Sequence, residues 1–140
     1  MAAIAKPASV PLFGLLVLTQ AAHSLEEYAG RLYEVFPPAR AVSGLFASDL
    51  RLGFVIFNAL LVGFGTWCYF WPVRRAWLSA KGLMWLWVGI ELVNGVGHPA
   101  WSLSVHRYTP GLVTALVLLP LALVLLRRLR AEPRDRVAAT

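Results

Sequence analysis

The sequence predicts an all-α polytopic membrane protein, with four transmembrane helices in an antiparallel bundle. Of its 140 residues, 59% belong to the hydrophobic set and only 14% are charged, whereas a soluble domain has about 45–50% apolar and about 25% charged residues. The apolar residues form runs of about 20 residues, the length that a bilayer requires, and these runs lack the period-two alternation of strands. A soluble globule and a disordered chain are therefore excluded, and a single cysteine, Cys68, excludes a disulfide scaffold.

The first two spans are predicted at about residues 8–30 and 51–73. The first is uncharged over most of its length and then meets a polar segment, through which helical character is expected to continue towards Leu32. The second is the clearest, because no formal charge occurs from Leu52 to Val73. A cleaved signal peptide is an alternative for the first span and would leave His23 as the new N-terminus, but retention gives an even number of spans.

The other two spans are predicted at about residues 77–101 and 110–127. The third contains one carboxyl group, Glu91, and the fourth ends in closely spaced arginines. All four spans belong to a single predicted domain over residues 1–130, with short connections, and residues 131–140 are predicted to form a short charged cytoplasmic tail.

The distribution of positive charge predicts the orientation of the spans. With the N-terminus inside, nine of the 13 lysines and arginines lie on the inner side and four lie on the outer side. The inner nine are Lys6, Arg74, Arg75, Lys81, Arg127, Arg128, Arg130, Arg134 and Arg136, and the outer four are Arg31, Arg40, Arg51 and Arg107. This bias favours both termini on the inside of a bacterial-type cytoplasmic membrane. It also accounts for the net charge of +6 without a nucleic-acid partner.

Polar residues gather near the end of the first predicted span. Glu26 and Glu27 follow His23 by three and four residues, and such offsets bring side chains onto one helix face. A neighbouring carboxylate can orient an imidazole and accept its proton. A charge pair at the membrane surface is the structural alternative for this segment.

A second polar stripe lies within the third predicted span. Glu91, Asn94 and His98 are spaced so that they share one face of a helix, and Pro99 is expected to loosen the backbone beside His98. The alternative is a polar seam that only joins helices. Glu91 argues for function, because a buried carboxylate must be paired or protonated.

The predicted topology brings both stripes to one depth. The first and third spans run outward, so their polar ends meet towards the outer leaflet and predict a single site there. Tyr108, in the loop before the fourth span, and Trp87, in the third span, are candidates for substrate binding. An interfacial aromatic anchor is the structural alternative for both residues.

The order and spacing of these residues resemble the motifs of the HXXEE-domain membrane proteins. The resemblance runs from about Leu12 to Leu126 and rests on His23-x-x-Glu26-Glu27, Asn94-x-x-x-His98 and Tyr108-x-Pro110-Gly111. It implies a small integral membrane protein with His23, Glu26, Glu27, Asn94 and His98 as its polar signature, and it does not supply a reaction. Glu91 is added from the helical stripe alone.

The favoured interpretation is a membrane-embedded enzyme without a cofactor. Burial and crowding favour the protonated form of a carboxyl group, so one of the three glutamates could protonate an alkene, epoxide or carbonyl. Isomerisation, cyclisation and epoxide opening are the reactions that such a site can perform on a lipophilic small molecule dissolved in the bilayer. The predicted catalytic residues are His23, Glu26, Glu27, Glu91, Asn94 and His98.

Three alternatives stay open. His23, Glu27, Glu91 and His98 could bind a divalent metal, as in a metal-dependent enzyme. Ionisable residues in a membrane also mark the paths of proton-coupled transporters. A structural membrane subunit would use the same groups to join helices, and glycines in the second and third spans permit a homo-oligomer.

Overall fold

The chain folds as a helical protein. A computed structural model describes residues 8–131, and these residues form six α-helices and one π-helix, with no strand among them. The predicted all-α class is therefore confirmed.

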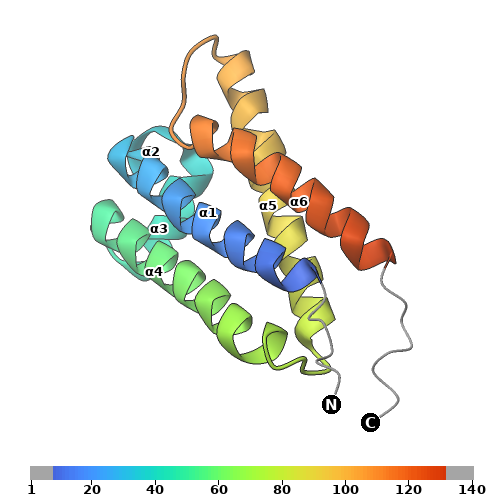
Figure 1. Cartoon of the computed structure of the whole chain (residues 1–140). Coiled ribbons are helices and arrows are strands. Elements are labelled where there is room, and N and C mark those ends of the chain that lie inside the picture. Colours follow the sequence, from blue (N-terminus) through green and yellow to red (C-terminus); the bar gives the residue numbers. More distant parts are fainter. Residues whose placement is uncertain (1–7, 132–140) are drawn as a thin grey trace, which may run out of the picture.

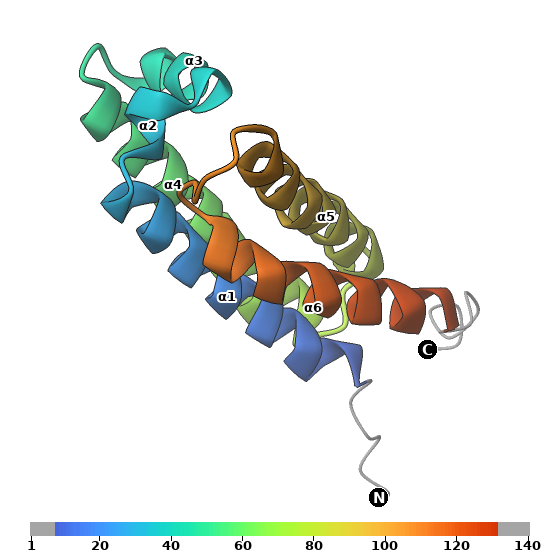
Figure 2. The same ribbon diagram turned by 90° about the horizontal axis from the view of Figure 1, so that it is seen from above.

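Four long helices make up the body of the molecule (Figure 1). They are α1 (Ser9–Ala29), α4 (Leu50–Cys68), α5 (Ala80–Ser104) and α6 (Leu112–Ala131). Helix α1 lies between α4 and α6, and α6 also packs along α5, while α4 and α5 touch only lightly (Figures 1 and 2). The polar segments of α1 and α5 consequently meet at α6.

The connection between the first two long helices is not the short loop that we expected. It contains α2 (Leu32–Val35) and α3 (Pro37–Phe46), which lie together at one end of the bundle (Figure 2). Arg31 has a left-handed backbone, with φ of 55°, so α1 stops at Ala29 instead of continuing to Leu32. Pro37 then occupies the first turn of α3, where its missing N–H costs nothing.

The third long helix also has different ends from those predicted. Ala76 adopts a left-handed φ of 53°, and the Trp77 N–H donates to the Pro72 carbonyl at 2.9 Å. This turn delays the start of α5 to Ala80 instead of residue 77. The helix continues past Pro99 to Ser104, so this proline does not end the helix.

The hydrophobic core lies mainly between α1, α5 and α6. Its completely buried members include Phe13, Leu16, Trp87, Leu118 and Leu125. A smaller cluster of Leu32, Tyr33 and Phe54 attaches α2 to α4. These two clusters fix the helices on either side of the polar residues.

Two helical segments among residues 8–131 are long and apolar enough to cross a membrane, namely Leu50–Val73 and Leu112–Ala131. Two such helices are weak evidence for a membrane location. Helices α1 and α5 carry more polar side chains, so the prediction of four spans is supported only for these two segments.

Candidate functional site

The site is centred on one carboxylate between two imidazoles. His23 Nε2 lies 3.3 Å from Glu27 Oε1, and His98 Nε2 lies 3.1 Å from the same oxygen. The rings of the two histidines meet edge to face, with centroids 4.7 Å apart. All three residues are buried. We call His23, Glu27 and His98 the imidazole–carboxylate cluster; it joins the two polar stripes from α1 and α5, which the sequence placed at one depth.

The orientation of His23 follows from its partner on α6. His23 Nδ1 lies 2.7 Å from Thr114 Oγ1, and the Thr114 hydroxyl donates to Glu26 Oε2 at 2.5 Å. A hydroxyl has only one hydrogen to donate, so Nδ1 of His23 must be the donor to Thr114. Nε2 of His23 is buried beside the Glu27 carboxylate and makes no hydrogen bond within residues 8–131.

Glu26 faces away from the cluster and holds the start of α6. Its carboxylate accepts the backbone N–H groups of Val113 and Thr114 at 3.0 and 2.8 Å, and these belong to the first turn of α6, where helix N–H groups have no partner inside the helix. The Tyr108 hydroxyl donates to the same carboxylate at 2.7 Å. Glu26 therefore acts on His23 only through Thr114.

The Pro110-Gly111 turn closes over both imidazoles. Gly111 has a φ of 91°, and a Cβ atom built there would lie 2.6 Å from His98 Cε1 and 2.9 Å from His23 Cε1. Only glycine satisfies both the backbone conformation and the close approach. This turn therefore packs directly against both imidazole rings and limits their movement.

Glu91 lies on the same face of α5 and is completely buried. One terminal atom of the Gln20 amide lies 3.0 and 3.1 Å from the two Glu91 oxygens. Asn94 Nδ2 lies 3.2 Å from that same amide atom and 3.3 Å from Glu91 Oε2. The identity of the Gln20 atom that faces Glu91 decides whether the carboxyl group carries a proton.

A chain of hydrogen bonds fixes the orientation of Gln20. Asn58 Nδ2 donates to the Phe54 carbonyl at 3.0 Å, so its Oδ1 accepts from the Ser24 hydroxyl at 2.7 Å. Ser24 Oγ is then free only to accept, and it accepts from Gln20 Nε2 at 3.2 Å.

The Gln20 oxygen therefore faces Glu91, and two oxygens at this distance need a hydrogen between them. Rotating the amide by half a turn would instead let its nitrogen donate to both Glu91 oxygens, at 3.0 and 3.1 Å, but would set it against Asn94 Nδ2 at 3.2 Å, donor against donor. With the Gln20 oxygen facing Glu91, the network is satisfied when Glu91 is protonated. We call Glu91, Gln20, Asn94, Ser24 and Asn58 the amide network.

A cavity of about 240 Å³ reaches the cluster from α2, α3 and α4. Its walls are mainly apolar, and its polar lining consists of Glu27, Ser43, Asn58, Asn94 and His98. The apolar lining residues are Leu32, Phe36, Pro38, Ala39, Val42, Phe54 and Phe57. No arginine or lysine of residues 8–131 lines it.

The structure separates the predicted site residues into groups. Glu27, Asn94 and His98 line the cavity, whereas His23 and Glu91 lie behind it. Trp87 is completely buried in the core, edge-on to Phe13. Trp87, Tyr108 and Glu26 do not line the cavity.

Sequence reasoning missed four polar residues that complete the site: Gln20, Ser24, Asn58 and Thr114. Gln20 precedes Ser24 and Glu27 at helical spacing, so it extends the polar face of α1 by one turn. That regular spacing was the available signal. Asn58 and Thr114 are isolated in apolar runs, and no local pattern links them to the histidines.

The cluster could hold a metal ion. Its three side chains each offer one ligand atom, and these atoms lie within 4.8 Å of one another. Glu91, which the sequence added as a fourth ligand, does not belong to this group. The set of two imidazoles and one carboxylate suits zinc and other divalent transition metals.

Comparison with known proteins supports the resemblance seen in the sequence. The model of a family described as "protein of unknown function with HXXEE motif" matches residues 14–125. No curated protein and no solved structure matches the chain. The match covers most of the chain, including the cluster, the amide network and the turn at Gly111.

Proposed function

This chain belongs to the family of proteins of unknown function with an HXXEE motif, and we propose that it is a membrane-embedded enzyme performing acid–base chemistry on a lipophilic small molecule. The observation that carries the proposal is a pair of buried carboxyl groups, Glu91 and Glu27, near an apolar cavity; in the proposal Glu91 is protonated and Glu27 is a carboxylate. Two carboxyl groups in opposite protonation states supply an acid and a base without a cofactor.

The cavity supports the choice of substrate. Its apolar wall suits a hydrocarbon body, and its polar end offers Glu27, Asn94 and His98. Because no cation lines it within residues 8–131, a substrate with a carboxylate or phosphate group would be repelled by Glu27. A neutral alcohol, alkene, epoxide or ketone fits this chemistry.

Each residue then has a defined role. Glu91 does not line the cavity, so it supplies its proton to the substrate through a water molecule beside Asn94, which lies one turn along α5 and orients the reacting group. Glu27 removes a proton from a neighbouring carbon or from water. His98, whose Nε2 lies 3.1 Å from Glu27 Oε1, then accepts this proton and releases it to water in the cavity. Thr114 and Glu26 position His23. One proton enters and one leaves, so isomerisation, cyclisation and epoxide opening all balance.

A test that needs no known substrate uses deuterium. Membranes containing the protein are incubated with a lipid extract in D₂O, and lipophilic compounds are compared by mass spectrometry. We expect at least one compound to gain one deuterium with the wild-type protein and not with Glu91→Gln or Glu27→Gln. Glu34→Gln, at an exposed carboxylate paired with Arg31, is the matched control. Absence of any labelled compound with the wild type would contradict the proposal.

We propose further that all four long helices cross the membrane. Large apolar side chains point outward from each of them, including Leu18 at 68% exposed, Leu60 at 58%, Val93 at 72% and Val117 at 48%. With both termini inside, the cluster lies towards the outer leaflet. Because Cys68 is buried, single cysteines placed at residues 47 and 79 report the side of the membrane by labelling; we expect labelling of residue 47 only from outside.

A metal-dependent enzyme is the second candidate, and one observation favours it. His23 Nε2 is buried and makes no hydrogen bond in residues 8–131, although it lies 3.3 Å from the Glu27 oxygen that His98 Nε2 also approaches. Zinc bonds of about 2.0–2.1 Å put neighbouring ligand atoms about 3.3 Å apart, close to the 3.3 and 3.1 Å found here. Metal-binding histidines usually donate a hydrogen bond from the ring nitrogen that does not bind the metal, which orients the ring. The hydrogen bond from His23 Nδ1 to Thr114 would have this role.

Elemental analysis of the purified protein separates the two candidates. One equivalent of metal in the wild type and in His106→Ala, but none in His23→Ala or His98→Ala, would establish the metal-dependent enzyme. His106 lies in an exposed loop and is the matched control. If metal-free protein still incorporates deuterium in the assay, the cofactor-free enzyme is the correct candidate.

A further inference from the structure

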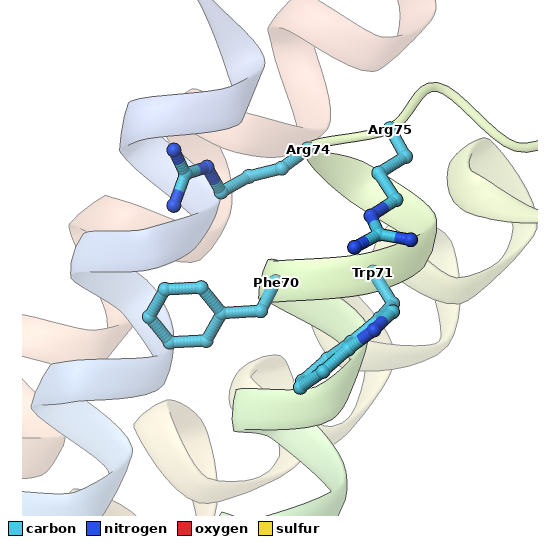
Figure 3. Close-up of a pocket in the computed structure, with 4 residues that line it drawn as sticks. All are labelled: Phe70, Trp71, Arg74 and Arg75. Carbon is cyan, nitrogen blue, oxygen red and sulfur yellow. The ribbon is translucent and has the colours of Figure 1, made fainter.

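A second cavity lies at the opposite end of α4 from α3. Its volume is about 340 Å³, and its lining consists of Phe70, Trp71, Arg74 and Arg75. Figure 3 shows the two guanidinium groups on either side of the opening, above the two aromatic rings. It shares no lining residue with the cavity at the cluster.

A widened helical turn places these four side chains on one face. Residues Tyr69–Val73 form a π-helix, labelled η1, in which the Arg74 N–H donates to the Tyr69 carbonyl at 3.0 Å. Pro72 lies inside this turn and cannot donate a backbone hydrogen bond. Single π-turns within helices occur frequently at functional sites, which is a reason to ask what this one binds.

The aromatic rings hold Arg74 in place. Its guanidinium carbon lies 5.9 Å from the centre of the Tyr69 ring and 5.6 Å from that of Phe70. Tyr69 is itself fixed against α1, because a Cβ atom at Gly14 would lie 2.7 Å from the Tyr69 ring. The cation therefore sits on a rigid platform that spans two helices.

Neither guanidinium is neutralised within the described part of the chain. No ion pair or side-chain hydrogen bond of residues 8–131 involves Arg74 or Arg75. Within residues 8–131 the acidic side chains are those of Glu26, Glu27, Glu34, Asp49 and Glu91. Asp49 caps the far end of α4, some 25 residues and roughly 37 Å of helix away from Arg74. Two adjacent arginines with free N–H groups suit the bidentate recognition of a phosphate.

The position of the pair along α4 identifies the source of that phosphate. Arg74 and Arg75 directly follow Leu50–Val73, one of the two segments able to cross a membrane, so they lie at the level of the lipid headgroups. Phe70 and Trp71 are 46% and 42% exposed beside them, where aromatic side chains contact the glycerol and upper acyl region. We propose that this cavity binds the phosphate group of an anionic membrane phospholipid. The proposal depends on α4 crossing the membrane and is independent of the chemistry at the cluster.

Native mass spectrometry of the full chain tests this proposal. The protein is extracted from membranes containing equal amounts of phosphatidylglycerol and phosphatidylcholine, and the retained lipids are identified. We expect phosphatidylglycerol to be retained preferentially, and this preference to fall by about fivefold for each arginine removed. The double variant R74Q/R75Q should thus retain both lipids equally. The variant R127Q/R128Q removes the same charge from the end of α6 and should keep the preference.

The outcomes separate a site from general attraction. Equal retention of the two lipids by the wild type would overturn the proposal, as would an equal loss in both double variants. Displacement of the lipid by millimolar inorganic phosphate would assign the site to a soluble phosphate instead. If circular dichroism shows that R74Q/R75Q is unfolded, R75Q replaces it, because the stacking of Arg74 on the rings is then left intact.

Discussion

Thr114 is the residue through which the start of α6 controls the cluster, and its replacement by valine tests that link. Valine has nearly the same shape but no hydroxyl. The change removes the hydrogen bond donated to Glu26 at 2.5 Å and leaves the buried His23 Nδ1–H without its acceptor at 2.7 Å. A hydrogen bond to a charged group contributes about 1.5–3 kcal/mol, and an unsatisfied buried donor costs about 1–3 kcal/mol.

Glu26 keeps its bonds from Tyr108 and from two backbone N–H groups, so the lower parts of these ranges apply. We expect Thr114→Val to lower the free energy of unfolding by about 2.5 kcal/mol. Equilibrium unfolding in detergent measures this change. Thr66→Val is the matched control, because Thr66 is exposed and bonds only to the Val62 carbonyl; its effect should stay below about 0.5 kcal/mol.

The same variant tests the proton assignment on His23. Nitrogen-15 spectra of labelled histidine distinguish a protonated Nδ1 from a protonated Nε2. We expect the wild type and Thr114→Ser to show the proton on Nδ1, and Thr114→Val to lose this preference. If valine changes neither the stability nor the spectrum, Thr114 does not position His23 and our account of Glu26 is wrong.

Three further predictions concern neighbouring groups. Glu91→Gln should cost less than about 1 kcal/mol, whereas Glu91→Ala should cost about 2–3 kcal/mol, because a glutamine amide can still donate to Gln20; equal losses on chemical unfolding would refute the protonated state. Gly111→Ala should destabilise the fold by at least about 2 kcal/mol through its positive φ and the contact with both imidazoles, and an unchanged melting temperature would contradict this. Burial, followed by the bond to Glu26, raises the pKa of Tyr108 to about 12. The raised pKa means that the stabilising bond is fully present below about pH 10, the usual tyrosine pKa, and is lost as the pH rises through about 12. Ultraviolet titration of the wild type minus Tyr108→Phe should show a single ionisation there, and one near pH 10 would refute the bond.

The sequence was most informative where a pattern repeats along one helix. Apolar runs predicted the four long helices, and the spacing of Glu91, Asn94 and His98 predicted one buried stripe. Charge counting then brought His23 and Glu27 to the same depth, and the structure joins them to His98 within 3.3 Å. The residues of each stripe repeat every three or four positions and can be seen locally, and the common depth of the two stripes follows from the predicted direction of the helices.

The remainder depends on contacts between distant segments. Glu26 and Glu27 are adjacent in the sequence, yet they face different neighbours, and only the packing of α6 on α1 distinguishes their roles. The helices α2 and α3 were missed because their ten or fewer residues give too short a pattern. Trp87 illustrates the opposite case: an aromatic residue one turn from Glu91 belongs to the core, since α1 covers it.

The hydrogen bonds between Glu26 and the first turn of α6 also have a consequence for the order in which the helices pack during folding. The HXXEE motif lies on the first helix, whereas the groups that satisfy it, from Tyr108 to Thr114, are synthesised some 80 residues later. Until α6 is in place, a carboxylate and an imidazole N–H of α1 lack the partners that α6 provides. A chain truncated before α6 would therefore carry unsatisfied polar groups in its first helix.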